Sequence, residues 1–295
     1  MKVAIFNANG LPGKADLIIN FLCRHQVDLM FVSETWLAKE RASAIQRTFL
    51  NMCKENRNII VGGRRATGGI LAFTNEKWQG MARVVYEDPD GNFAITEAGE
   101  TMYAFGYFPP SMIDRAVTDF FEKALELADG NRLIICGDLN ARVGTVSGDH
   151  ATNTRGNLVR RWVEENGLEI EKPVEGEFTS FNVHMGGFGM PDLVITANGA
   201  STRQLTAHEN ESLGGSDHRP LSWEIDGSPP ARRFTRWNIR RLKEPEIRQC
   251  YYHTLQNTAT LALSGINNTE ACVENAWASF KSWVEDAAEI SCGRL

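Results

Sequence analysis

The sequence predicts an α/β fold in which two β-sheets pack face to face and helices cover their outer sides. Three observations support this fold class. Short apolar runs recur along the first 226 residues and are separated by turns rich in Gly, Asn and Asp. A few other segments repeat apolar residues at helical spacing. The chain has 295 residues, 42% hydrophobic and 23% charged, which is enough for a large core and excludes a disordered protein.

The predicted strands are short apolar runs bounded by turn residues. Several of them, such as 29–32 and 133–136, are apolar at every position, which is typical of strands buried on both faces. In chain order the predicted strands are 3–6, 29–32, 59–61, 69–73, 82–86, 93–97, 103–107, 133–136, 178–181, 193–196, 203–207 and 221–225.

Three predicted helices lie between these strands. Apolar residues recur at helical spacing over 17–22, 113–128 and 158–163. Residues 111–114 (Ser-Met-Ile-Asp) precede the second helix and are predicted to form its capping box.

A change of composition at residue 226 predicts a domain boundary. Residues 226–230 (Asp-Gly-Ser-Pro-Pro) are typical of a linker, and six basic residues follow within the next segment. Two long helical patterns come after them. The expected organisation is a main domain at 1–226, a Pro/Arg-rich basic linker at 227–243 and a helical extension at 244–295. The last helix has a long apolar stripe, so the extension docks on the main domain, dimerises or belongs to a longer protein.

Composition excludes several functional classes. The net charge is −6, and residues 229–295 hold 9 basic and 7 acidic residues, so the first 228 carry −8. A nucleic-acid function would therefore have to come from a site and not from bulk charge. No apolar run approaches the roughly 20 residues of a membrane span, and the first 15 residues lack a signal-peptide core. The six cysteines are scattered without a Cys-x-x-Cys pair, which indicates reduced thiols in an intracellular protein.

Five polar clusters adjoin the predicted strands. They are Asn7-x-Asn9-Gly-Leu, Ser33-Glu34-Thr35-Trp36, Gly137-Asp138-Leu-Asn140, Pro191-Asp192-Leu and Ser216-Asp217-His218-Arg-Pro. Carboxylates, amides and one histidine suit a hard, oxygen-ligated cation such as Mg²⁺ and the metal-assisted hydrolysis of a phosphodiester. Each cluster alone is also typical of an ordinary turn or cap, so the prediction depends on all five occurring together.

The clusters occur in an order that resembles the endonuclease/exonuclease/phosphatase superfamily, which includes deoxyribonuclease I, exonuclease III and apurinic endonucleases. Within it, the chain resembles the endonuclease domain of non-LTR (LINE-type) retrotransposons. The resemblance covers residues 1–226. It is carried by the five clusters and by Gly68-Gly69-Ile-Leu-Ala, Gly106-Tyr107-Phe-Pro-Pro110, Arg155-Gly156 and Thr179.

The resemblance implies a deoxyribonuclease I-like four-layer α/β sandwich with a metal site. Glu34 would be the principal ligand of Mg²⁺, or alternatively of Mn²⁺. Asn9 and Asp217 would complete the shell of the cation. Asp138 would activate the attacking water, and Asn7 would hold Asp138 in place.

The resemblance also implies how the phosphate is bound. Asn140 would stabilise the phosphate oxygens, and His218 would contact the scissile phosphate while Asp192 fixes its tautomer. Tyr107 and Thr179 would line the phosphate pocket. Further contacts with phosphate or DNA are expected from Ser216 and from a basic cluster formed by Arg232, Arg233 and Arg236.

The chain departs from the repair enzymes at two positions. They often carry Asp where Asn9 stands, and they usually carry Lys where Trp36 follows Glu-Thr. The expected activity is therefore that of a retroelement nuclease, which nicks one strand of double-stranded DNA and leaves a 3′-hydroxyl for reverse transcription. The expected partner is a reverse transcriptase domain in a longer polyprotein, and the expected location is the nucleus if genomic DNA is the target.

Three alternatives stay open at this point. The same fold could serve a phosphoesterase acting on lipid or inositol phosphates, or an apurinic-site repair enzyme. A domesticated module that binds nucleic acid without cleaving it is a third alternative. The intact set of polar clusters argues against the last of these.

Overall fold

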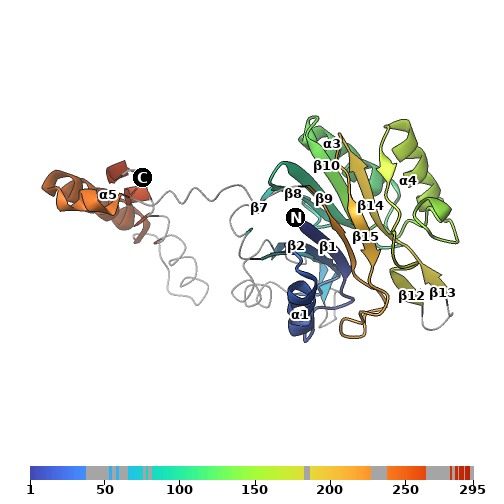
Figure 1. Ribbon diagram of the computed structural model, residues 1–295. Helices are drawn as coiled ribbons and strands as arrows, with labels where there is room; N and C mark the ends of the chain where they lie inside the picture. Colours follow the sequence, from blue (N-terminus) through green and yellow to red (C-terminus); the bar gives the residue numbers. More distant parts are fainter. Residues whose placement is uncertain are drawn as a thin grey trace. The chain divides into compact units, whose positions relative to one another are not determined.

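The computed structural model describes residues 1–37, 53–54, 58–59, 66–75, 78, 82–182, 187–226, 238–263, 280, 283–284, 286–288 and 290–292. The chain divides into two compact units, Met1–Pro230 and Ala231–Leu295. The larger unit contains both principal sheets (Figure 1). The described part of the smaller unit contains a short 3-10 helix, η2 (Ile239–Lys243), inside the segment predicted as linker, and the helix α5 (Pro245–Leu263).

The first sheet has six strands and a mixed arrangement. Its central pair β1–β2 is parallel, and its other pairs are antiparallel. In spatial order its strands are β15 (Arg203–Ala207), β16 (Leu221–Glu224), β1 (Lys2–Asn7), β2 (Leu29–Ser33), β6 (Ile70–Thr74) and β3 (Cys53–Lys54).

The second sheet has the same size and also one parallel pair, β9–β10. In spatial order its strands are β11 (Glu169–Ile170), β14 (Asp192–Ala197), β10 (Arg132–Asp138), β9 (Thr101–Tyr107), β8 (Phe93–Ala98) and β7 (Ala82–Glu87). Two small ladders pair β4 (Asn58–Ile59) with β5 (Ala66–Thr67) and β12 (Ser180–Asn182) with β13 (Gly187–Gly189). The predicted strand 59–61 lies outside the described residues except for Ile59.

Three apolar cores hold four layers together. The inner core lies between the sheets, where Phe31 of β2 stacks on Phe105 of β9 with ring centroids 5.0 Å apart. Helix α1 (Ala15–His25) covers the outer face of the first sheet through a second core. Helices α3 (Arg115–Ala128) and α4 (Thr154–Glu165) cover the second sheet through a third (Figure 1). The predicted sandwich of two packed mixed sheets flanked by helices is confirmed.

The central strands are buried on both faces, which explains their continuous apolar runs. In β1, Val3 and Ile5 belong to the inner core, whereas Ala4 and Phe6 pack towards α1. Successive side chains of a strand point to opposite faces, so parity along each strand decides which residues face the other sheet.

The predicted capping box at 111–114 is not formed. Helix α3 has Asp114 as its N-cap residue, but the side chain makes no capping hydrogen bond. Asp114 instead pairs with Arg155 of α4, with 3.0 Å between Oδ1 and Nε. The Asp114 carboxylate, which the local sequence predicted to cap α3, therefore binds Arg155 of α4 instead.

Two further observations concern the helices and the cysteines of the described residues. None of their helices is long and apolar enough to cross a bilayer. Cys23, Cys136, Cys250 and Cys292 are free thiols.

His208 fastens α1 to the edge of the first sheet. Its Nε2 lies 2.7 Å from Ser222 Oγ in β16, and its ring meets those of Phe21 and His25 in α1. Burial lowers the pKa of His208 to about 4, and the charge of His25 contributes in the same direction. The folded protein therefore binds the proton less well than the unfolded chain.

This shift predicts a specific loss of stability in mild acid. The contribution of a neutral His208 is complete above its unfolded pKa of about 6.5 and is lost as the pH falls from there towards 4. Urea unfolding at pH 7.5 and pH 5 should show a smaller loss in His208→Gln than in the wild type. An equal loss in both proteins would contradict this role for His208.

Candidate active site

Strand parity brings the polar clusters to the space between the two sheets at one edge. Asn7 has the parity of Val3 and Ile5, which face the inner core. In the second sheet, Asp138 has the parity of Ile134 and Cys136, which also face it. Because β1–β2 and β9–β10 are parallel pairs, their carboxyl ends lie together at the edge of each sheet.

The strand registers place further side chains beside these two. Asp138 lies opposite Tyr107 in β9 and opposite Asp192, the first residue of β14. Gly137 makes this close pairing feasible, because a Cβ there would lie 2.0 Å from the carbonyl oxygen of Gly106, and its φ is +134°.

Asn7 connects the two sheets through its carboxamide. Its Nδ2 donates to Asp138 Oδ2 at 2.8 Å and to Glu34 Oε1 at 3.1 Å. Asn7 is 1% exposed, and its hydrogen bond to Asp138 is buried whereas the one to Glu34 is partly buried. One amide therefore sets the position of the carboxylates predicted for metal binding and for activation of water.

Glu34 lies just beyond the end of β2, and one oxygen of its carboxylate accepts two hydrogen bonds. Tyr107 Oη donates to Glu34 Oε1 at 2.5 Å, the same oxygen that accepts from Asn7. Burial raises the pKa of Tyr107, and its hydrogen bond to Glu34 adds to the shift, so the phenol stays neutral. Glu34 has a φ of +49°, a backbone conformation that is rare for a residue with a side chain.

Asn9 and Asp217 lie next to this carboxylate group. Asn9 Nδ2 donates to Asp217 Oδ1 at 2.9 Å, and the backbone N–H of Asn9 donates to Asn7 Oδ1 at 2.9 Å. Hydrogen bonds through Asn7 thus link Glu34 with Asn9 and Asp217, the three residues predicted to bind a metal.

Asp138, Asp192 and His218 form the buried centre of the site. His218 Nδ1 lies 2.9 Å from Asp192 Oδ2, and its Nε2 lies 3.8 Å from Asp138 Oδ2. Thr179 donates through Oγ1 to Asp192 Oδ2 at 2.6 Å. Asp192 is therefore fixed from two sides and in turn orients the imidazole ring.

Burial and charge change the protonation of this centre. Burial raises the pKa of Asp138 to about 7, and the charge of Asp192 adds to the shift while that of His218 opposes it. Burial lowers the pKa of His218, but the carboxylates of Asp192 and Asp138 outweigh it and raise that pKa to about 10. The carboxylates thus favour the protonated form of His218, which has two N–H donors, and burial makes Asp138 a stronger base than a free carboxylate.

Asn140 and Ser216 support the same region in different ways. The backbone N–H of Asn140 donates to Asp138 Oδ1 at 3.0 Å, and its side-chain Nδ2 donates to the carbonyl oxygen of Phe108 at 3.2 Å. Ser216 Oγ donates to the carbonyl oxygen of Asn7 at 2.8 Å and accepts from His218 N–H at 3.1 Å. The Ser216 hydroxyl thus has partners within the protein, and its predicted contact with phosphate stays a prediction. The basic cluster of Arg232, Arg233 and Arg236 lies outside the described residues.

Two groups of side chains are candidates to hold a cation. Asp138, Asp192 and His218 bring potential ligand atoms within 4.8 Å of one another, which no other His, Cys, Asp or Glu group in the described residues does. A protonated imidazole, however, has no lone pair for a metal. Glu34, Asn9 and Asp217 offer only oxygen ligands, which fits Mg²⁺ better.

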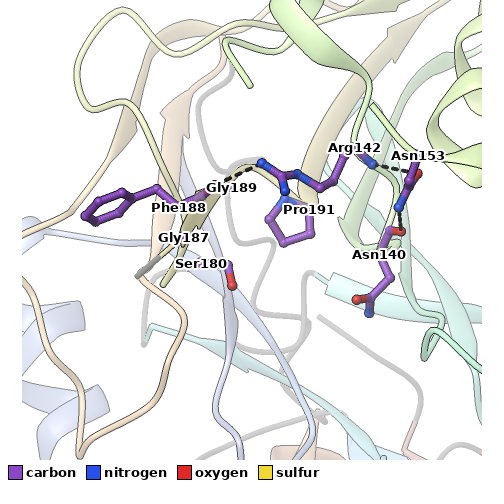
Figure 2. Close-up of a pocket in the computed structure, with 8 residues that line it drawn as sticks. All are labelled: Asn140, Arg142, Asn153, Ser180, Gly187, Phe188, Gly189 and Pro191. Carbon is purple, nitrogen blue, oxygen red and sulfur yellow. Dashed lines mark hydrogen bonds between the residues drawn. The ribbon is translucent and has the colours of Figure 1, made fainter. Parts of the chain in front are cut away.

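A pocket of about 310 Å³ opens beside this centre (Figure 2). Arg142 forms one wall, where its guanidinium makes two hydrogen bonds to Asp149, at 2.6 and 2.9 Å, and one to the carbonyl oxygen of Phe188 at 2.9 Å. The ring of Phe188 belongs to β13, is 53% exposed and packs against Phe178 and Phe181. The residues lining the pocket are Asn140, Arg142, Asn153, Ser180, Gly187, Phe188, Gly189 and Pro191.

Sequence reasoning missed one supporting residue of the site. Arg155 of α4 is 5% exposed, and its guanidinium donates to four backbone carbonyl oxygens. They belong to Phe108, Pro109, Met112 and Leu139. Arg155 thereby fixes the segments that follow Tyr107 and Asp138. Its only sequence signal was its place in the Arg-Gly pair of the family resemblance.

Comparisons with known proteins show a family and a fold that the chain is similar to. Residues 102–222 match the family described as endonuclease-reverse transcriptase. The whole chain is 23% identical to the RNA-directed DNA polymerase from mobile element jockey of Drosophila melanogaster, and it spans only 31% of that protein's length. The family resemblance predicted from the sequence is confirmed.

Two solved structures show the same fold. An AP endonuclease from Archaeoglobus fulgidus has a TM-score of 0.57 at 14% identity, with 77% of this chain and 100% of that chain covered. The endonuclease domain of TRAS1, a telomere-specific non-LTR retrotransposon, has a TM-score of 0.55 at 18% identity, with 77% and 99% covered.

The contacts of Arg155 predict a large effect on stability. Arg155→Met would leave four carbonyl oxygens without their donor and Asp114 without its partner, at about 1–3 kcal/mol for a buried group left unsatisfied. We expect a loss of at least about 3 kcal/mol in the free energy of unfolding. Arg161→Met, on the same helix but 72% exposed, is the matched control and should change it by no more than about 0.5 kcal/mol. Similar losses in the two variants would show that Arg155 is an ordinary helix residue.

Proposed function

We propose that this chain, whose residues 102–222 match the endonuclease-reverse transcriptase family, is a divalent-metal-dependent endonuclease that nicks one strand of double-stranded DNA. The observation that carries the proposal is the pair of carboxylates, Glu34 and Asp138, joined by Asn7 and placed beside a buried Asp192–His218 pair. An AP endonuclease and the endonuclease domain of a non-LTR retrotransposon are among the structures that share this fold.

The residues divide the hydrolysis between them. Asp138 takes the proton of the attacking water, whose oxygen bonds to phosphorus as the bond from phosphorus to the 3′ oxygen breaks. The departing 3′ oxygen takes up a proton from solvent. The products are a 5′-phosphate and a 3′-hydroxyl. His218 and the Asn140 amide stabilise the charge that builds up on the phosphate oxygens. Glu34, Asn9 and Asp217 would hold Mg²⁺, or alternatively Mn²⁺, which supplies Lewis-acid stabilisation of that charge.

The pocket beside Asn140 supports a polynucleotide substrate. Its volume of about 310 Å³ suits one nucleotide next to the scissile phosphate. The exposed Phe188 ring offers a stacking surface for a base. A phosphoesterase for inositol phosphates would have no use for the stacking surface.

The jockey match supports a role in retrotransposition. That relative is an RNA-directed DNA polymerase more than three times as long as this chain. We infer that the nick would supply the 3′-hydroxyl from which such a polymerase extends, and that the two activities belong to one polyprotein.

The proposal predicts metal-dependent nicking of supercoiled plasmid DNA. Conversion to open circles should require Mg²⁺ and stop with EDTA. Asp138→Asn and His218→Ala should each slow nicking at least about 100-fold. Asp138→Asn removes the base, and His218→Ala removes the group that stabilises the negative charge on the phosphate oxygens. Asp119→Asn, an exposed carboxylate on α3, is the control and should nick at the wild-type rate.

Circular dichroism would establish that both variants fold. Near-normal turnover in a folded variant would remove that residue from the mechanism. Intact plasmid with a folded wild-type protein, together with release of phosphate from an inositol phosphate, would identify the phosphoesterase instead. Binding of DNA without any cleavage would identify the inactive module.

The basic cluster predicts a separate effect on DNA binding. Replacing Arg232, Arg233 and Arg236 by Gln should weaken binding and reduce its salt dependence, by a slope of about 0.9 for each phosphate that the protein no longer neutralises. Cleavage at saturating DNA should be almost unchanged. A control that replaces three exposed arginines elsewhere, Arg83, Arg160 and Arg161, changes the net charge equally. Equal weakening by both triple variants would mean that only net charge matters.

A further inference from the structure

We infer that Lys14 is a positioning residue for metal binding, because it ties together the two loops that carry Asn9 and Asp217. This inference deepens the proposed function and rests on it for the identity of the metal ligands. Neither the sequence motifs nor the family resemblance singled out Lys14.

The ammonium group of Lys14 closes the turn that presents Asn9. Lys14 lies between β1 and α1, and its Nζ donates to the carbonyl oxygens of Ala8 and Asn9 at 2.5 and 3.1 Å. Asn9 has a φ of +43°, which costs free energy for a residue with a side chain. Two charge-assisted hydrogen bonds to adjacent carbonyls offset that cost and hold the turn.

The hydrocarbon stem of Lys14 packs on the second loop. A Cβ built on Gly214 would lie 2.5 Å from Cγ, 2.7 Å from Cδ and 3.1 Å from Cε of Lys14. Gly214 also has a φ of +65° and lies three residues before Asp217. The stem can therefore pass so close to this backbone only because residue 214 has no side chain.

Charge gives Lys14 a second means of acting on the site. Burial lowers the pKa of Lys14, and the negative charges of Asp217 and Glu34 oppose that shift. The ammonium is thus within electrostatic reach of both carboxylates.

The stem and the ammonium group of Lys14 together hold the loop of Asn9 against the loop of Asp217. Asn9 and Asp217 are 208 residues apart in sequence and meet through a single hydrogen bond of 2.9 Å between side chains. Lys14 contacts the backbone on both sides of that meeting point. Residues that orient metal ligands in this way commonly change metal affinity by about 10–100-fold when they are removed.

The test is the affinity of the full chain for Mn²⁺ in Lys14→Met, measured by electron paramagnetic resonance. Methionine keeps most of the stem and removes the charge and both hydrogen bonds. We expect roughly tenfold weaker binding, and a correspondingly higher Mg²⁺ concentration for half-maximal nicking with little change at saturating metal. Lys14→Arg keeps the charge and should lie closer to the wild type. Lys123→Met, on the surface of α3, is the control and should bind Mn²⁺ as the wild type does.

Hydrogen exchange of the metal-free proteins gives a readout that needs no cation. Lys14→Met should exchange faster in peptides covering 8–14 and 212–218, with β10 and β14 unchanged. Equal or tighter Mn²⁺ binding, or unchanged exchange in either loop, would overturn the inference. The proposed function would fail if the wild type bound no Mn²⁺ or bound it independently of Glu34. In that case a Lys14 that still ordered the two loops would have a structural role only.

Discussion

The carboxamide of Asn7 is the contact on which the rest of the site depends, because it joins the two sheets where their polar strand ends meet. One nitrogen donates to Glu34 in the first sheet's strand-end loop and to Asp138 in the second sheet. This geometry follows from packing. The inner core fixes how the two sheets face each other, and strand parity turns Asn7 and Asp138 inward. A shift of either sheet by one residue would separate the two carboxylates.

The site separates two kinds of chemistry that both need carboxylates. Around Glu34 the side chains that we propose as metal ligands offer oxygen atoms, which suits a hard cation. Around Asp138 the partners are the buried His218 ring and a second carboxylate, Asp192. The two carboxylates raise the pKa of His218, and burial raises that of Asp138. The close approach of Asp138, Asp192 and His218 is therefore better explained by proton transfer and phosphate binding than by metal binding.

The sequence predicted the two-sheet fold and the polar clusters because both are local signals: apolar runs, turns, and the side chains that follow strand ends. It could not predict contacts that depend on distant packing. Asp114 was expected to cap a helix, but Arg155, 41 residues away, takes its carboxylate. Lys14 and Arg155 gave no periodic signal, because a cation that binds backbone carbonyl oxygens has the same sequence pattern as one that faces solvent. The roles assigned to Thr179 and Ser216 also depend on partners that spacing does not reveal.

The division between the metal ligands and the proton-transfer centre is the central claim, and anomalous diffraction from crystals soaked in MnCl₂ tests it most directly. The account predicts a manganese peak on the Glu34 carboxylate, with Asn9 and Asp217 around it, and no peak between Asp192 and His218. A peak between Asp138, Asp192 and His218, with none at Glu34, would contradict it.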